Sequence, residues 1–200
     1  GFTRLSGNTD SQTLIGKTLL TWLTGNFTYS LRGEVRNVTK DDKTSAEQYL
    51  VAGRERYELD GPHYLFGFAR WEKDRFAGYD QQLSAIGGYG RQILENDTHV
   101  FSLEAGPGYR HDRLREHGDY RLAVAYTALD YQWFFSDYAD IQQEMSFEYT
   151  DQNTTSRSLT ALTARLNSKL SLRLSHEIKH NSQPPDDTSE RTDNTTSASL

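Results

Sequence analysis

Strict alternation between apolar and polar residues is the feature that most constrains the fold of this 200-residue chain. In the segments 27–36, 101–110, 141–150 and 170–179, one set of alternate positions holds 20 residues, none of which carries a formal charge when His is neutral. The 20 positions between them include ten charged residues. Because successive side chains of a β-strand point to opposite faces, this period of two predicts strands with one apolar and one charged face. Glu55 is an exception, since the alternation places it on the apolar face.

The whole chain can be divided into twelve such strands by its turn residues. We expect strands at about 1–7, 12–23, 27–38, 46–57, 62–74, 81–92, 98–111, 119–134, 140–150, 156–166, 170–180 and 191–200. Tight turns such as Gly25-Asn26 and Asp60-Gly61 follow the even-numbered strands. Longer polar connections, among them 39–44, 113–118 and 182–190, follow most of the odd-numbered strands. Short turns on one rim and longer loops on the other are typical of outer-membrane barrels.

Composition excludes several other classes of protein. The chain has no Cys, which excludes a disulfide framework, thiolate metal sites and a cysteine nucleophile. Its 22 Lys and Arg against 28 Asp and Glu form no long run of one sign, so we expect no nucleic-acid partner. No run approaches the length of a membrane helix, whereas barrel strands hide their lipid face by alternation. No signal peptide is recognisable, so we expect the sequence to be the mature form of an exported protein.

Alternation alone leaves open whether the apolar face contacts lipid or the core of a soluble barrel or sandwich, and the aromatic residues favour lipid. Near the predicted tight-turn rim are Trp22, Phe27, Tyr57, Tyr64, Trp133 and Phe135. Near the predicted long-loop rim are Tyr49, Trp71, Tyr109 and Tyr149. Two such belts are expected at the two interfaces of a membrane. The sequence therefore predicts an all-β fold, a 12-stranded antiparallel transmembrane up-and-down β-barrel that forms a single domain over residues 1–200.

The charged faces of the strands would then line the lumen. The third and fourth strands contribute a basic wall, Arg32, Arg36, Arg54 and Arg56. The eighth and ninth contribute an acidic wall, Asp130, Glu144 and Glu148. A twelve-stranded barrel is about 20–25 Å across, so we expect a water-filled gap between opposite walls. In the alternative interpretation, neighbouring charges pair and fill the lumen.

A second group of charges is predicted where the fifth strand meets its outer loop and on a nearby strand. It comprises Glu72, Asp74, Arg75, Asp80, Glu104 and Arg110. Such an outer mouth suits a cation or a lipopolysaccharide phosphate, and a solvated, hydrogen-bonded rim is the alternative.

Catalytic and cofactor motifs are not recognisable. The six His residues form no Ser–His–acid grouping, and on one strand His176 and His180 would lie roughly 13 Å apart, too far for one metal. Gly16-Lys17-Thr18 lacks the earlier glycine of a phosphate loop. We therefore expect a protein that is not an enzyme and has no metal or cofactor.

Several motifs resemble one bacterial family. They are Ser6–Asp10 (SGNTD), Tyr64–Gly67 (YLFG), Trp71–Asp80 (WEKDRFAGYD), Leu103–Arg110 (LEAGPGYR), Ala161–Asn167 (ALTARLN) and Asn181–Pro185 (NSQPP). In this order they are similar to the salt-induced outer-membrane protein family, whose function is unknown. The resemblance covers essentially the whole chain and implies a β-barrel in the outer membrane of a Gram-negative bacterium. It also implies contact with outer-membrane lipids, lipopolysaccharide and the barrel-insertion machinery.

The resemblance supplies no activity and no catalytic residue. In one departure, the chain stops at Ala198-Ser199-Leu200, whereas outer-membrane barrels usually end in an aromatic residue. We expect either that a few residues follow or that insertion is unusual here. The charged lumen predicts a porin-like passage for ions or small solutes, and the resemblance implies a role in osmotic or salt stress. The alternative is a closed, non-conducting barrel with a structural or ligand- or lipid-binding role.

Overall fold

The computed structural model describes residues 2–5, 11–40, 43–74, 79–114, 118–167, 170–183 and 191–199. Within these ranges the chain forms twelve strands. They are β1 (Phe2–Leu5), β2 (Ser11–Thr24), β3 (Phe27–Lys40), β4 (Lys43–Glu58), β5 (His63–Asp74), β6 (Tyr79–Glu95), β7 (His99–Leu114), β8 (Gly118–Ser136), β9 (Ala139–Tyr149), β10 (Thr154–Arg165), β11 (Ser171–Asn181) and β12 (Thr192–Ser199). None of the described residues forms a helix that is able to cross a membrane.

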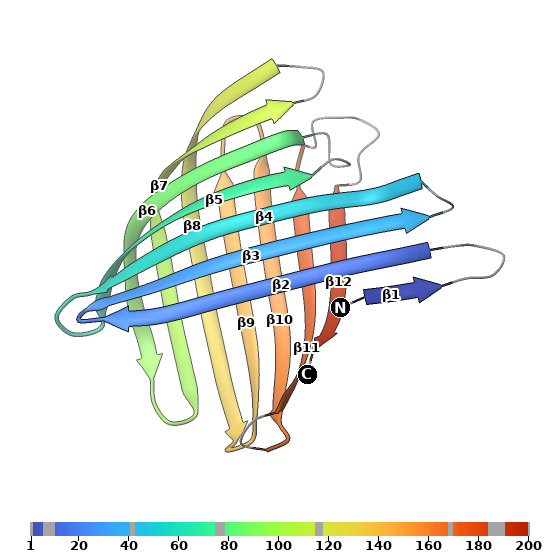
Figure 1. Cartoon of the computed structure of the whole chain (residues 1–200). Coiled ribbons are helices and arrows are strands. Elements are labelled where there is room, and N and C mark those ends of the chain that lie inside the picture. Colours follow the sequence, from blue (N-terminus) through green and yellow to red (C-terminus); the bar gives the residue numbers. More distant parts are fainter. Residues whose placement is uncertain are drawn as a thin grey trace.

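Each strand pairs antiparallel with the next, in the order β1 to β12, and the resulting sheet is strongly curled (Figure 1). The curl brings distant strands together, because Lys17 of β2 lies 3.9 Å from Glu177 of β11 and Glu72 of β5 lies 3.5 Å from Lys179 of β11. The fold is therefore an all-β, half-barrel-like sheet with a concave face that encloses an interior. No backbone pairing between β12 and β1 or β2 occurs among the described residues.

The tight turns lie where the sequence predicts them, whereas two of the predicted longer loops are shorter than expected. Gly25 and Gly61, with φ of 59° and 72°, form part of the tight turns at the predicted positions. The predicted longer loop 39–44 is wrong, because β3 continues to Lys40 and β4 begins at Lys43. The same holds for 113–118, where β7 ends at Leu114 and β8 begins at Gly118. Extending a hairpin pairs backbone groups that a loop would leave to water, and polar side chains do not prevent it.

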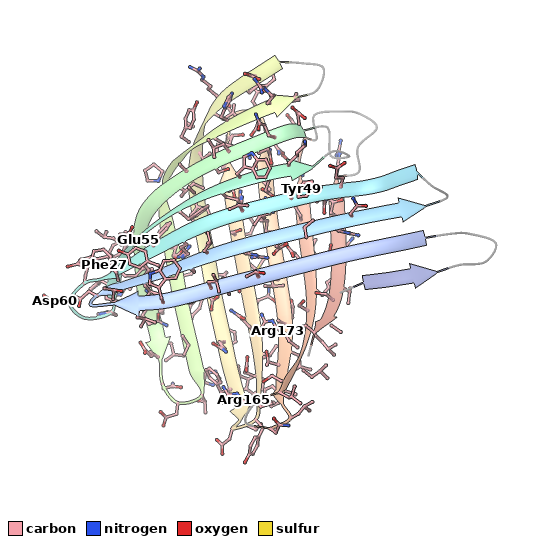
Figure 2. All side chains as sticks on the ribbon, in the orientation of Figure 1. Phe27, Tyr49, Glu55, Asp60, Arg165 and Arg173 are labelled. Carbon is pink, nitrogen blue, oxygen red and sulfur yellow. The ribbon has the colours of Figure 1, made fainter. Side chains whose placement is uncertain are left out.

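The convex face carries the apolar set of the alternation and the predicted aromatic belts. Eight of the nine predicted belt residues occupy convex register positions: Trp22, Phe27, Tyr57, Trp133, Tyr49, Trp71, Tyr109 and Tyr149. Phe135 lies at a register shift of β8 and is exposed beside Trp133. Several of these rings contact aromatic neighbours, with centroids 4.6 Å apart for Phe27 and Tyr57 and 5.7 Å apart for Trp133 and Phe135. Figure 2 labels Phe27 near the tight turns and Tyr49 farther along the sheet.

Tyr64 does not belong to this belt, which corrects the prediction. Its side chain lies on the concave face with an exposed fraction of 0% and packs with Phe66, Ile86, Val124 and Tyr126. Room for these rings comes from glycines on the concave side of β6 and β7, since a Cβ on Gly90 would overlap the Tyr64 ring. Because glycines have no side chain, they leave room on the concave side of the sheet, and the apolar core lies inside the curl.

Gly88 lies at a close approach between β6 and β7. A Cβ there would overlap the carbonyl oxygen of Ala105 and lie 2.7 Å from Cα of Gly106, and neither backbone atom can move alone. We expect Gly88→Ala to lower the free energy of unfolding by about 1–3 kcal/mol. Gly33→Ala is the matched control, because its Cβ would meet nothing within 4 Å. Urea unfolding in one detergent compares the two, and equal stability would contradict the close approach.

Candidate functional site

The concave face carries a group of charges that we name the interior ion network. It consists of Arg70 and Glu72 of β5, Arg110 of β7, Glu148 of β9, Arg157 of β10 and Lys179 of β11. Each residue occupies an alternate position of its strand, so its side chain emerges on the concave face. The curl then brings together charges that the chain separates by 78 to 107 residues.

Glu72 lies at the centre of this network. Arg157 donates Nη2 to Glu72 Oε2 at 2.7 Å, and Lys179 donates Nζ to Glu72 Oε1 at 3.5 Å. Arg70 Nε lies 3.0 Å from Glu72 Oε2. One carboxylate therefore binds cations from its own strand and from two strands of the facing wall.

Glu148 forms the most deeply buried part of the network. Arg70 donates Nη2 to Glu148 Oε1 at 2.5 Å, and Arg110 Nη1 lies 3.9 Å from Glu148 Oε2. Arg110 also donates Nε to Asp112 at 3.0 Å. The side chains of Arg110 and Glu148 are each only 2% exposed. Charges removed from water to this extent persist only when they are paired, so ion pairs occupy the middle of the interior.

Nearer the tight turns, a second set of contacts surrounds Tyr64. The Tyr64 hydroxyl donates to Glu104 at 3.0 Å, and Arg54 pairs with the same carboxylate. Arg56 lies over the Tyr64 ring at 3.5 Å and pairs with Glu58 at 2.5 Å. The interior at this level contains aromatic rings and ion pairs.

Two of the predicted acidic residues accept hydrogen bonds from one amide side chain on β9. Gln142 donates Nε2 to Asp130 at 3.2 Å and to Glu144 at 2.9 Å. Its Oε1 accepts a hydrogen bond from Arg173 at 3.0 Å. The amide fixes both carboxylates, and no group of three or more metal-ligating residues exists in the part of the chain that the structure describes.

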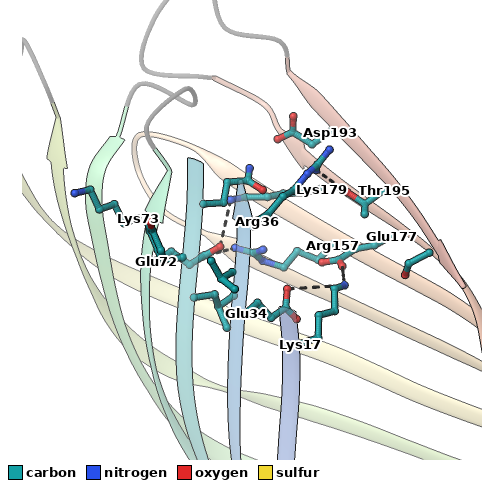
Figure 3. Close-up of a pocket in the computed structure, with 15 residues that line it drawn as sticks. Lys17, Glu34, Arg36, Glu72, Lys73, Arg157, Glu177, Lys179, Asp193 and Thr195 are labelled. Atoms are coloured by element: carbon teal, nitrogen blue, oxygen red, sulfur yellow. Dashed lines mark hydrogen bonds and ion pairs between the residues drawn. The ribbon is translucent and has the colours of Figure 1, made fainter. Parts of the chain in front are cut away.

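Beside the interior ion network is a cavity of about 850 Å³, counting the solvent that it joins (Figure 3). Its charged lining includes Lys17, Glu34, Arg36, Glu72, Arg157, Glu177, Lys179 and Asp193. Lys17 lies 3.9 Å from both Glu34 and Glu177 and is 40% exposed. Arg36 donates Nη1 to Thr195 at 3.4 Å, while its Nε is buried without a hydrogen-bond partner. Both signs of charge face this space, which suits a polar or dipolar solute.

The predicted basic and acidic walls lie on the concave face, and among the described residues no ion pair joins a residue of one wall to a residue of the other. Arg32 pairs with Glu34 of its own strand, and Arg54 with Glu104. Glu148 of the acidic wall binds Arg70, which belongs to neither predicted wall. At the level of Glu148, an ion pair with Arg70 crosses the interior where the sequence predicts a water-filled gap. Contacts between β5 and the β9–β11 wall indicate a flatter interior.

The predicted outer mouth is not one cluster. Glu72 and Arg110 belong to the interior ion network, whereas Glu104 pairs in register with Gly90, near the tight-turn end. Asp80 lies in β6 and is half-buried. Asp74 ends β5, and both its side chain and Arg75 lie outside the described residues.

Arg157 is the network residue that the sequence reasoning missed. Small residues occupy both faces of the surrounding strand, so the contrast between faces is weak there. Alternation along β10 could have placed Arg157. Leu162 and Ala164 face outward, so the odd-numbered positions of this strand, Arg157 among them, face inward. The same alternation along β5 would have assigned Tyr64 to the interior, on the face of Phe66 and Phe68.

Comparisons with known proteins give a family and a relative. A family model described as "Protein of unknown function, DUF481" matches residues 1–200. The "Uncharacterized protein YdiY" of Escherichia coli (strain K12) is 35% identical over 200 residues, which are 100% of this chain and 79% of that protein. A solved structure from "Unveiling the Mechanism Behind the in-meso Crystallization of Membrane Proteins" is 13% identical and covers 98% of this chain and 77% of that chain. Its TM-score is 0.41, too low to support an inference.

Proposed function

We propose that the chain, which belongs to the DUF481 family of proteins of unknown function, is a closed, non-conducting β-barrel of a bacterial outer membrane. In this proposal, pairing between the first and last strands completes the barrel. The interior ion network then seals it at mid-depth, and the cavity beside the network forms a binding vestibule for a polar solute.

The convex face supports insertion in a membrane. It exposes large apolar side chains from six strands, among them Leu31, Leu83, Leu103, Phe147, Leu162 and Leu174. A patch of this extent is unusual on a soluble monomer and suits hydrocarbon. Because hydrocarbon cannot hydrogen-bond to backbone groups, strands that cross it must all be paired, which favours closure of the curled sheet.

The ion pairs of Arg157 and Lys179 with Glu72 are the main observation that supports the closed state. These residues come from facing walls, so their pairing joins the walls instead of lining a bore. Glu148 and Arg110, each 2% exposed, continue the seal toward β7 and β9. Ions would have to break several buried pairs in order to pass.

A gated passage for ions or small solutes is the second candidate, and the solvent-joined cavity favours it. Lys17 is 40% exposed at 3.9 Å from its two carboxylate partners, so salt screens these pairs more than the buried ones. The role in osmotic or salt stress is proposed from the family resemblance alone. The same is true of contacts with lipopolysaccharide and with the insertion machinery. We propose no catalytic role.

Planar-bilayer recording of the purified chain tests the closed state. We expect the wild type to be silent and Glu72→Gln to give discrete, anion-selective currents, since the variant leaves Arg157 and Lys179 without their carboxylate. Glu58→Gln is the control, because its pair with Arg56 lies at the tight-turn end of β4. Frequent discrete currents from the wild type would overturn the closed state in favour of the passage.

A further inference from the structure

Glu55 is a carboxylate on the apolar convex face. It lies in β4 and has Tyr29 of β3 and Gly67 of β5 as its cross-strand partners. Figure 2 labels it near Phe27, toward the tight-turn end of the two strands. The side chain is exposed and forms no hydrogen bond or ion pair with the residues that the structure describes. An ionisable group on a lipid-facing surface is costly when it has no partner, so a ligand or partner should supply the opposite charge.

The surface around Glu55 is hollowed. A depression of about 660 Å³, counting the solvent that it joins, is lined by residues that include Trp22, Tyr29, Leu31, Gly53, Gly67 and Ala69. Packing does not impose the two glycines, because a Cβ on Gly53 would meet nothing within 4 Å and one on Gly67 would come no closer than 3.9 Å to any atom. Larger side chains there would fill the hollow beside the carboxylate.

The level of the hollow relative to the aromatic belt indicates what occupies it. Glu55 is two residues from Tyr57, whose ring packs against Phe27 in the tight-turn belt. Such belts lie at the level of lipid head groups. The rings of Trp22 and Tyr29, with centroids 5.6 Å apart, form one side of the hollow, and aromatic faces attract ammonium groups. A carboxylate, aromatic rings and an apolar floor together match an amphiphile with a cationic head.

We propose that this hollow binds a phospholipid with a primary ammonium head group, such as phosphatidylethanolamine. The ammonium pairs with Glu55 beside Trp22 and Tyr29, and an acyl chain lies along Gly53 and Gly67. A primary ammonium is preferred to choline because its N–H groups donate charge-assisted hydrogen bonds to the carboxylate. The inference rests on the proposed insertion of the convex face in a membrane.

Lipid retention measured by native mass spectrometry tests this site. The full chain is reconstituted with equal amounts of phosphatidylethanolamine and phosphatidylcholine and then released in mild detergent. We expect the wild type to retain phosphatidylethanolamine about five-fold over phosphatidylcholine, as one interfacial pair with an aromatic contribution would give. In Glu55→Gln the preference should fall to about one. Glu58→Gln, which removes a charge three residues along the same strand, should keep the preference, and Gly53→Leu should lower retention of both lipids.

Flotation of the chain with phosphatidylcholine vesicles separates two kinds of failure. If the wild type floats but shows no preference, or if Glu55→Gln keeps the preference, the inference is overturned and the membrane proposal stands. A folded chain that does not float would overturn the membrane proposal itself. Equal loss of the preference in Glu58→Gln would reduce the effect to surface charge and would also overturn the site.

Discussion

Glu148→Gln is expected to lower the free energy of unfolding by about 3–5 kcal/mol, the usual cost of breaking a buried ion pair from one side. The substitution keeps the volume of the side chain but removes the charge that binds Arg70 at 2.5 Å and lies 3.9 Å from Arg110. Arg110 is 2% exposed and cannot turn to water. Its charge would remain buried with Asp112 as its remaining ion-pair partner among the described residues.

Urea unfolding in detergent, followed by tryptophan fluorescence, measures this loss. Glu58→Gln is the matched control, because its side chain is 44% exposed and its pair with Arg56 should contribute less than about 1 kcal/mol. A loss no larger than that of Glu58→Gln would refute the buried seal.

Tyr64→Ala should have an effect of similar size, about 3–5 kcal/mol. The ring is 0% exposed, packs with Phe66 and lies beneath the guanidinium of Arg56. Tyr64→Phe keeps the packing and removes only the hydrogen bond to Glu104, so about 1.5–3 kcal/mol should be lost.

The same unfolding measurement distinguishes this interior ring from the convex rings. Tyr149→Ala is the control, because that side chain is 62% exposed on the convex face. Its loss in detergent should be well below that of Tyr64→Ala. If the two variants were equally destabilised, Tyr64 would have no special role in filling the interior.

Most strand positions could be predicted from the sequence because alternation and turn residues are local signals. Strand β9 was expected at 140–150 and spans Ala139–Tyr149, and β5 was expected at 62–74 and spans His63–Asp74. The outer loops were harder, since polar residues such as those of 39–44 are compatible with a loop and with the solvated end of a hairpin. Polarity there indicates solvent, not the end of a strand.

The pairing of the site residues could not be predicted, because it depends on how tightly the sheet curls. Alternation correctly indicates the face of Arg54. Its partner Glu104 lies three strands away, however, and only the curl of the sheet brings the two side chains into contact. Tyr64 illustrates a conflict between two signals. Its short distance from the turn suggests an aromatic belt, whereas alternation places it on the same face as Phe66, inside the curl. The structure follows the alternation.

The bonds from Glu72 to Arg157 and Lys179 span 85 and 107 residues of chain, and this separation has a consequence for biogenesis. If the chain inserts in a membrane as proposed, a nascent sheet that lacked β10 and β11 would carry this carboxylate into the bilayer with Arg70 as its only described counter-ion. Sequential delivery of hairpins from the N-terminal side would therefore meet a large desolvation barrier. We expect the strands to assemble outside the hydrocarbon and to enter it together, after the C-terminal hairpin has docked.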